Sequence, residues 1–184
     1  TNYYPENSDP KNNLFVKQAY NYMNAFHSDV FADGCYPSYM VSYLKNHGWM
    51  PEFEDGDEEL LKYTVDYLAF SYYRSNTLSS GSFDYNIPYA EIVNKHIVKN
   101  PYLDATEWGW EKDAVGLRWT MNEMYQRHKL PVFILENGMG AREELNENDE
   151  INDDYRIEYH KNHIIEMKNA ILEDGVDCMG YVTW

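Results

Sequence analysis

Three short runs of mainly apolar residues predict β-strands. They are residues 65–73 (VDYLAFSYY), 131–135 (PVFIL) and 179–184 (MGYVTW). Apolar and polar positions do not alternate in these runs, which is typical of strands covered on both faces in a parallel sheet.

Two longer segments with apolar positions at helical spacing separate these strands. The first follows Asp113, a candidate N-cap, and the second begins at Asp153 or Asp154 and stops before Gly175. The spaced positions are Leu117, Met121, Met124 and His128 in the first segment and Ile157, His160, Ile164, Met167 and Ile171 in the second. A third amphipathic stretch opens the chain, with one face formed by Val16, Tyr20 and Met23. Strands alternating with helices predict an α/β fold with a parallel sheet.

Two segments lack a sustained period and are expected to be loops. Residues 79–110 are long for a loop in a compact domain, which favours a lid or a binding loop. Their aromatic side chains include Phe83, Tyr85, Tyr89, Tyr102, Trp108 and Trp110. Residues 143–154 are acidic but lack the glycine that a calcium-binding EF-hand loop requires, so a solvated loop is expected there.

Composition indicates a folded protein and disfavours polyanionic partners. The 184 residues are 43% hydrophobic and 16% aromatic, enough for one core, and we expect a single domain over residues 1–184. A formal charge of -16 disfavours nucleic acid and anionic membrane surfaces as partners. A small anionic substrate stays compatible with this charge, because a few local cations can bind it.

Nothing in the sequence directs the chain to export. Cys35 and Cys178 belong to no CxxC pattern, so reduced thiols in the cytoplasm are expected. There is no leader peptide, no apolar run near the ~20 residues that span a bilayer, and no N-x-S/T acceptor. The chain starts without Met and stops in a strand, so we expect a fragment of a longer protein.

The sharpest candidate for chemistry is Glu136, which ends the apolar strand LPVFIL directly before Asn137 and Gly138. In a barrel of parallel strands this position opens onto the active-site face. From the local pattern alone, the end of a strand beside a turn is the better explanation of Glu136.

Aromatic residues accompany this carboxylate at two places. In the run Phe70-Ser71-Tyr72-Tyr73 one tyrosine could share the mouth with Glu136, and a phenol that donates a hydrogen bond keeps a carboxylate ionised and oriented. The alternative is that these are ordinary strand aromatics. Trp108, Trp110 and Trp184 offer flat faces and N–H groups that suit sugar rings, although core packing explains each of them equally well.

A metal site is not expected. His160 and His163 lie three apart on a predicted helix with Glu166 nearby, but no further ligand is apparent and His160 fits the apolar stripe.

Taken in order, four segments resemble motifs of glycoside hydrolase family 1. Residues 33–37 (DGCYP) resemble its G-x-Y-P segment, and residues 66–73 (DYLAFSYY) resemble its D-F-x-G-x-N-Y-Y strand. Residues 135–138 (LENG) resemble its nucleophile motif T/V-E-N-G, and residues 180–184 (GYVTW) resemble its G-Y-x-x-W ending. Four motifs in order are far more specific than one.

The resemblance implies the C-terminal part of a (β/α)₈ TIM barrel, strands six to eight with their helices. It implies a retaining hydrolase in which Glu136 is the nucleophile and Tyr73 is its hydrogen-bond partner. Trp184 would wall the subsite of the cleaved sugar, and Trp110 would line the leaving-group side. The residues expected to contact substrate are Trp110, Trp184, Ser71 and Tyr72. No cofactor is implied.

Departures from the usual motifs of the family change the expected substrate and the expected set of catalytic residues. Ser71 stands where most members have asparagine, and the run FSYY with residues 100–103 (NPYL) and 107–110 (EWGW) resembles the bacterial 6-phospho-β-glucosidase branch. The expected substrate is therefore a phosphorylated β-glucoside. The N-E-P acid/base motif is missing, since Asn122-Glu123-Met124 lies inside a predicted helix, and residues that grip the phosphate are expected beyond Trp184.

Two other functional classes stay open at this point. A carbohydrate-binding module would use its tryptophans as a stacking platform, with Glu136 bonding only a hydroxyl. An α/β interaction domain would make the motifs coincidental. A partial barrel also exposes sheet edges, so we expect the isolated chain to form a homo-oligomer or a swapped assembly.

Overall fold

The computed structural model describes residues 1–80 and 87–184, which form two compact units. The first unit comprises Thr1–Asn2, Ala69–Asn76 and Lys99–Trp184, and the second comprises Tyr3–Leu68 and Thr77–Val98. The single domain expected over residues 1–184 stays a prediction. Phe83 and Tyr85 of the expected binding loop lie outside the described residues.

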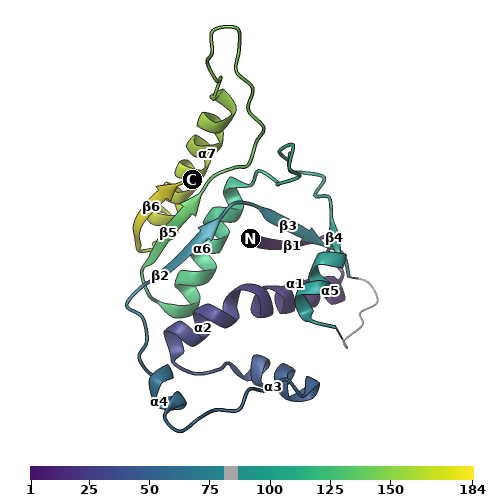
Figure 1. Cartoon of the computed structure of the whole chain (residues 1–184), viewed down its shortest axis with the longest axis vertical. Coiled ribbons are helices and arrows are strands. Elements are labelled where there is room, and N and C mark those ends of the chain that lie inside the picture. Colours follow the sequence, from purple (N-terminus) through teal and green to yellow (C-terminus); the bar gives the residue numbers. More distant parts are fainter. Residues whose placement is uncertain (81–86) are drawn as a thin grey trace. The chain divides into compact units, whose positions relative to one another are not determined.

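The three predicted strands form one sheet in the first unit. They are β2 (Leu68–Tyr72), β5 (Val132–Asn137) and β6 (Cys178–Thr183), in the order β2-β5-β6, and β5 pairs with β6 in parallel (Figure 1). The sequence placed the start of β2 three residues too early. The N–H of Val65 instead bonds the carbonyl of Phe31, outside the strand ladder.

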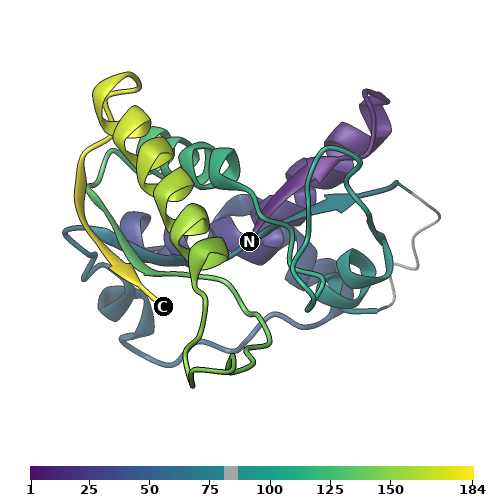
Figure 2. The ribbon, with the colours of Figure 1, turned by 90° about the horizontal axis from the view of Figure 1, so that it is seen from above.

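Two helices connect these strands. Helix α6 (Ala114–His128) is capped by the carboxylate of Asp113, which accepts a hydrogen bond from the N–H of Gly116 at 2.9 Å, as predicted. Helix α7 (Asp154–Leu172) begins after Asp153 and ends shortly before Gly175. The two helices pack side by side (Figure 2).

One face of the sheet is buried in an apolar core. Leu117 and Met121 of α6 and Val132 and Ile134 of β5 are all fully buried. Residues 133 and 135 of β5 are not buried, so β5 alternates between a covered and an open face along its first four residues. The local α/β order is that of the predicted fold class.

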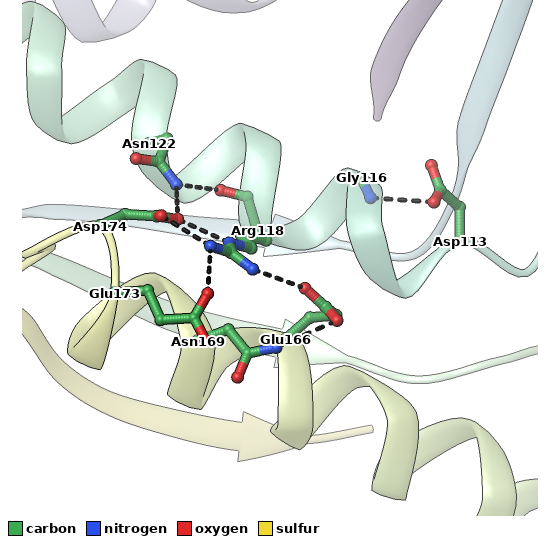
Figure 3. A network of polar contacts seen from close by, with 8 residues as sticks. All are labelled: Asp113, Gly116, Arg118, Asn122, Glu166, Asn169, Glu173 and Asp174. Carbon is green, nitrogen blue, oxygen red and sulfur yellow. Dashed lines mark hydrogen bonds and ion pairs between the residues drawn. The ribbon is translucent and has the colours of Figure 1, made fainter.

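A cluster of charged groups joins α6 to the end of α7 (Figure 3). The guanidinium of Arg118 donates two hydrogen bonds to the carboxylate of Asp174, at 2.6 and 2.7 Å, and one to Glu173 at 2.9 Å. Asn122 donates to the same Asp174 carboxylate at 2.6 Å, and Glu166 lies 3.6 Å from Arg118. The bidentate pair of Arg118 with Asp174 is the strong form of an arginine–carboxylate interaction.

The second unit is mainly helical. Its helices are α1 (Pro10–Tyr20), the π-helical turn η1 (Asn21–Ala25), α2 (Phe26–Asp33), α3 (Ser38–His47), α4 (Asp57–Leu61) and α5 (Tyr89–Lys95). The strands β1 (Asn2–Pro5), β3 (Ser75–Leu78) and β4 (Ile97–Val98) form a small sheet in the order β1-β3-β4. The predicted amphipathic opening is confirmed, because Val16 and Tyr20 are buried and Met23 packs against the same core.

The expectation of an irregular segment over residues 79–110 is partly wrong. It contains α5 and β4, and the buried positions Tyr89, Ile92 and Val93 follow helical spacing within only seven residues. Such a short helix gives too few turns for a sequence period to emerge. By contrast, the acidic residues 143–153 form no helix or strand, as expected. No helix in the described part of the chain is long and apolar enough to cross a membrane.

Candidate active site

The carboxyl ends of the three strands of the first unit meet at one edge of the sheet. The side-chain amide of Asn137, at the end of β5, donates to the carbonyl of Tyr72 at the end of β2, over 2.7 Å. The N–H of Trp184, just after β6, donates to the carbonyl of Asn137 over 2.8 Å. The residues that end these strands are therefore neighbours in space.

Glu136 lies at this edge beside the hydroxyl groups of Ser71 in β2 and of Tyr73, which directly follows this strand. The phenol of Tyr73 donates a short hydrogen bond to Oε2 of Glu136, and the hydroxyl of Ser71 lies 3.5 Å from the same oxygen. The expected proximity of Tyr73 and Glu136 is confirmed, while Ser71 is at the limit of a hydrogen bond. A carboxylate that accepts a hydrogen bond from a fixed donor is held in one orientation.

Aromatic rings surround this pair. The ring of Tyr73 lies 5.4 Å from the ring of Trp184, edge to face, and 5.5 Å from the ring of Trp110. Trp110 and Trp184 are stacked at 6.3 Å, and the guanidinium of Arg74 lies over the ring of Trp110 at 5.6 Å. Flat apolar faces beside a carboxylate suit a sugar ring.

An irregularity in β5 turns Glu136 towards these residues. Ile134 pairs with Tyr181, but the next pair is Asn137 with Thr183, so β5 has one more residue than β6 over this stretch. Regular alternation would place Glu136 on the covered face with Val132 and Ile134. The extra residue instead leaves Asn137 buried and Glu136 beside Tyr73. Bulges beside active sites commonly redirect a side chain in this way.

The hydroxyl of Tyr73 is held in its neutral form. Burial and, after it, the hydrogen bond to Glu136 raise the pKa of Tyr73 to about 12. A phenol with this pKa carries its proton throughout the neutral range, so it can donate to the carboxylate.

The structure corrects the expectation that Tyr72 contacts substrate. Tyr72 is fully buried, and its hydroxyl lies 2.9 Å from both the hydroxyl of Ser75 and the carbonyl of Asp113. Neighbouring side chains in a strand point to opposite faces, so Ser71 and Tyr73 share the open face while Tyr72 turns to the helices. Of the six site residues named from the sequence, five come together and Tyr72 does not.

Two glycines allow tryptophans to approach β5. A methyl group on Gly138 would overlap the backbone carbonyl of Trp184, and one on Gly140 would overlap the ring of Trp108. Trp108 in turn packs edge to face on Trp110 at 5.6 Å. Both glycines therefore provide space for the aromatic frame rather than chain flexibility.

The two histidines of α7 have separate hydrogen-bond partners. Nδ1 of His160 lies 3.0 Å from the hydroxyl of Tyr181, and Nδ1 of His163 lies 2.8 Å from the carbonyl of Tyr159. Burial lowers the pKa of His163 to about 4, so its ring is neutral at pH 7. Within residues 1–80 and 87–184, neither histidine belongs to a group of three clustered metal-ligating side chains.

Sequence reasoning missed Asn137, Tyr159 and Tyr181. Asn137 is fully buried beside Glu136, and the hydroxyl of Tyr181 donates to its side-chain oxygen over 2.7 Å. Tyr159 of α7 donates to the carbonyl of Tyr73 over 3.0 Å. Tyr159 lies outside the apolar stripe predicted for its helix, so no pattern in the sequence indicated its role.

The profile of glycosyl hydrolase family 1 matches residues 1–184, the whole chain. The chain belongs to glycosyl hydrolase family 1. It is 42% identical over 185 residues to "Aryl-phospho-beta-D-glucosidase BglA" of Bacillus subtilis (strain 168), covering 98% of this chain and 38% of that protein. It is 43% identical over 183 residues to "6-phospho-beta-glucosidase AscB" of Escherichia coli (strain K12), covering 100% of this chain and 38% of that protein.

Solved structures share the fold of this chain. "Family 1 b-glucosidase from Thermotoga maritima" superposes with a TM-score of 0.82 over 99% of this chain and 39% of that one, at 22% identity. The predicted fold class is thereby confirmed: the chain has the fold of the C-terminal part of a (β/α)₈ TIM barrel. Its strands β2, β5 and β6 take the places of barrel strands six, seven and eight. The chain spans about two fifths of the length of these relatives.

Proposed function

We propose that the protein containing these residues is a retaining β-glycoside hydrolase that acts on 6-phospho-β-glucosides, with Glu136 as its nucleophile. The observation that carries the proposal is the ionisable carboxylate of Glu136 at the carboxyl edge of a parallel sheet, bonded by Tyr73 and faced by two tryptophans. In a βα-barrel, catalytic groups come from this edge.

The reaction would proceed in two displacements. An acid protonates the glycosidic oxygen while Glu136 attacks the anomeric carbon, so the bond to the leaving alcohol breaks and a glycosyl ester forms. Water, deprotonated by the same acid/base group, then attacks the anomeric carbon and releases Glu136 as a carboxylate. Glu123 does not suit the acid/base role, because it lies within α6 and pairs with Arg127 at 4.0 Å. We infer that a residue outside positions 1–184 supplies it.

The neighbouring side chains have complementary roles in this proposal. Tyr73 holds the carboxylate of Glu136 in one orientation, because its phenol donates to Oε2. Trp184 forms a wall of the subsite for the cleaved sugar, and Trp110 lines the leaving-group side. Ser71 offers a hydroxyl to the substrate beside the carboxylate.

The phosphorylated substrate is inferred from the relatives. BglA and AscB are named for aryl-phospho-β-glucosides and 6-phospho-β-glucosides, at 42% and 43% identity. We place the groups that bind the phosphate outside the 184 residues, and we expect a cytoplasmic enzyme without a metal or organic cofactor.

Covalent labelling tests the proposal. The full-length protein is treated with a 2-deoxy-2-fluoro-β-glucoside 6-phosphate carrying a good leaving group, and the labelled peptide is mapped. We expect the label on Glu136, and we expect Glu136→Gln to lower hydrolysis of the non-fluorinated substrate at least about 1,000-fold. Glu144→Gln, an exposed carboxylate in the loop after β5, is the matched control and should retain activity. Labelling at any other residue would refute the nucleophile assignment.

A non-catalytic carbohydrate-binding module is the second candidate. It is favoured by Trp108 and Trp184, whose residues are 50% and 54% exposed. Such a module would bind a β-glucoside without hydrolysing it, and Glu136→Gln would leave the affinity unchanged. Calorimetric titration of both forms separates the two candidates.

A further inference from the structure

Asn137 makes hydrogen bonds to both neighbouring strands at the active-site edge. Its side-chain N–H donates to the carbonyl of Tyr72 in β2, and its side-chain oxygen accepts from the hydroxyl of Tyr181 in β6, each over 2.7 Å. Its backbone carbonyl accepts from the N–H of Trp184 over 2.8 Å. The side chain is fully buried, so these bonds face no competition from water.

Helix α7 completes this arrangement. The hydroxyl of Tyr159 donates to the carbonyl of Tyr73 over 3.0 Å and lies 3.3 Å from the side-chain nitrogen of Asn137, which can donate to it. The hydroxyl of Tyr181 gives its hydrogen to Asn137, so Nδ1 of His160, 3.0 Å away, must carry the hydrogen of that contact. Every polar atom of the Asn137 side chain thus has a partner.

Each of these hydrogen bonds involves a residue that is next to, or part of, the group of side chains around the Glu136 carboxylate. Asn137 follows Glu136 directly, Tyr72 precedes Tyr73, and Trp184 is itself part of the aromatic frame. The bonds therefore fix the backbone on both sides of the Tyr73–Glu136 contact. The extra residue in β5 makes this fixation necessary, because regular strand pairing is interrupted between Ile134 and Asn137.

We propose that Asn137 is a positioning residue for catalysis, which holds Glu136, Tyr73 and Trp184 in register by bonding the ends of β2 and β6 from β5. This inference rests on the proposed function for its kinetic consequence, but the geometry that it describes is independent of any substrate. Loss of the Asn137 side chain would leave the carbonyl of Tyr72 without this donor and the hydroxyl of Tyr181 without this acceptor in a buried place. The strand ends would then shift, and a displacement of about 1 Å at reacting groups can cost 100-fold in rate.

The test compares three variants of the full-length protein. Asn137→Leu keeps the size of the side chain and removes all of its hydrogen bonds. Tyr181→Phe removes only the donor to Asn137 and keeps the ring. Tyr63→Phe is the control for the loss of a phenol, because Tyr63 is 85% exposed and lies outside the site.

Two quantities are measured on the folded fraction of each variant. The first is kcat/KM on an aryl 6-phospho-β-glucoside, which we expect to fall roughly 100-fold in Asn137→Leu, about fivefold in Tyr181→Phe, and not at all in the control. The second is the titration of the Tyr73 phenol, followed by its ¹³Cζ resonance and assigned with Tyr73→Phe. The pKa of Tyr73, which burial and then the bond to Glu136 raise to about 12, should fall in Asn137→Leu as that bond loosens.

A purely structural role for Asn137 predicts a different result. In that case the melting temperature falls, while kcat/KM of the folded fraction stays within about threefold and the Tyr73 titration does not move. That outcome in both Asn137→Leu and Tyr181→Phe would overturn the inference. If the native protein hydrolyses no β-glycoside, the proposed function fails, and the Tyr73 titration alone then decides whether Asn137 controls the contact.

Discussion

The phenol of Tyr73 donates a hydrogen bond to the carboxylate of Glu136 and forms ring contacts with both Trp110 and Trp184. A single residue therefore links the charged centre of the site to its aromatic walls. Removing its hydroxyl separates these two functions, because the ring of phenylalanine still packs against the tryptophans.

We predict that Tyr73→Phe lowers kcat/KM roughly ten- to 100-fold with little change in stability. The estimate follows from the ~1.5–3 kcal/mol of a hydrogen bond to a charged group and from tenfold in rate for each ~1.4 kcal/mol. Steady-state kinetics of the full-length protein measure the effect. Because the pKa of Tyr73 is about 12, its deprotonation should cause no loss of activity between pH 6 and 10. An unchanged kcat/KM in Tyr73→Phe would contradict the role given to the phenol.

The glycines after Glu136 give a second prediction at this scale. A methyl group on Gly138 would meet the backbone of Trp184, which cannot rotate away, whereas on Gly140 it would meet the ring of Trp108, which can. Gly138→Ala should therefore destabilise the protein by about 1–3 kcal/mol and reduce activity, with a smaller effect for Gly140→Ala. Denaturant unfolding and kinetics of the pair measure this difference, and equal effects would argue against it.

At the scale of the elements, β2, β5, β6, α6 and α7 were predictable, whereas α2 to α5 and the small sheet of the second unit were not. The apolar face predicted for α7 is wrong, because Ile157 is 63% exposed and Ile164 43%, while Tyr159 and His163 are buried. The placement of Tyr73 beside Glu136 followed from strand ends in a parallel sheet. The irregularity in β5 was not predictable, because it depends on pairing with β6 and leaves no signature in the sequence. The roles of Asn137 and Tyr181 were missed for the same reason. The prediction for Tyr72 was wrong because its side chain points to the face opposite Ser71 and Tyr73.

The cluster around Arg118 gives a prediction about the packing of α6 on α7. Hydrogen bonds from Arg118 and Asn122 lower the pKa of Asp174 to about 2, below its ordinary value of 3.8. A depressed pKa means that this stabilisation is complete above about pH 4 and is lost as the pH falls through about 2. Arg118→Leu should therefore lower the melting temperature at pH 7, and the difference from the native protein should shrink towards pH 2.

Thermal unfolding at several pH values tests this prediction. Arg127→Leu is the comparison variant, since Arg127 lies on the same helix and pairs with Glu123 at 4.0 Å. Its effect at pH 7 should be smaller. A difference between Arg118→Leu and the native protein that stays constant down to pH 2 would mean that Asp174 is not the partner that matters.

At the scale of the whole molecule, the 184-residue chain has unsatisfied surfaces. β2 and β6 are the outer strands of their sheet in the described structure, and β5 and β6 carry exposed apolar residues. Leu135 is 49% exposed, Met179 57% and Val182 44%. Such edges and patches promote pairing with another chain.

We therefore predict that the chain of residues 1–184, prepared alone, forms dimers or larger assemblies. Sedimentation velocity over a range of concentrations measures this directly. Asp or Lys at position 135 on the open face should reduce association, whereas the same change at the exposed Leu145 of the acidic loop should not. A stable monomer at high concentration would contradict the prediction.

Helix α7 makes its two main sets of polar contacts at separate places. Tyr159 donates a hydrogen bond to the backbone at the strand ends near Glu136. Glu173 and Asp174, which accept hydrogen bonds from Arg118, follow about 14 residues later, roughly 20 Å away by helical rise. Changes at sites that far apart usually combine additively. Engineering for heat resistance can thus concentrate on the Arg118 end and be screened by melting temperature alone, while turnover is tuned independently at the other end.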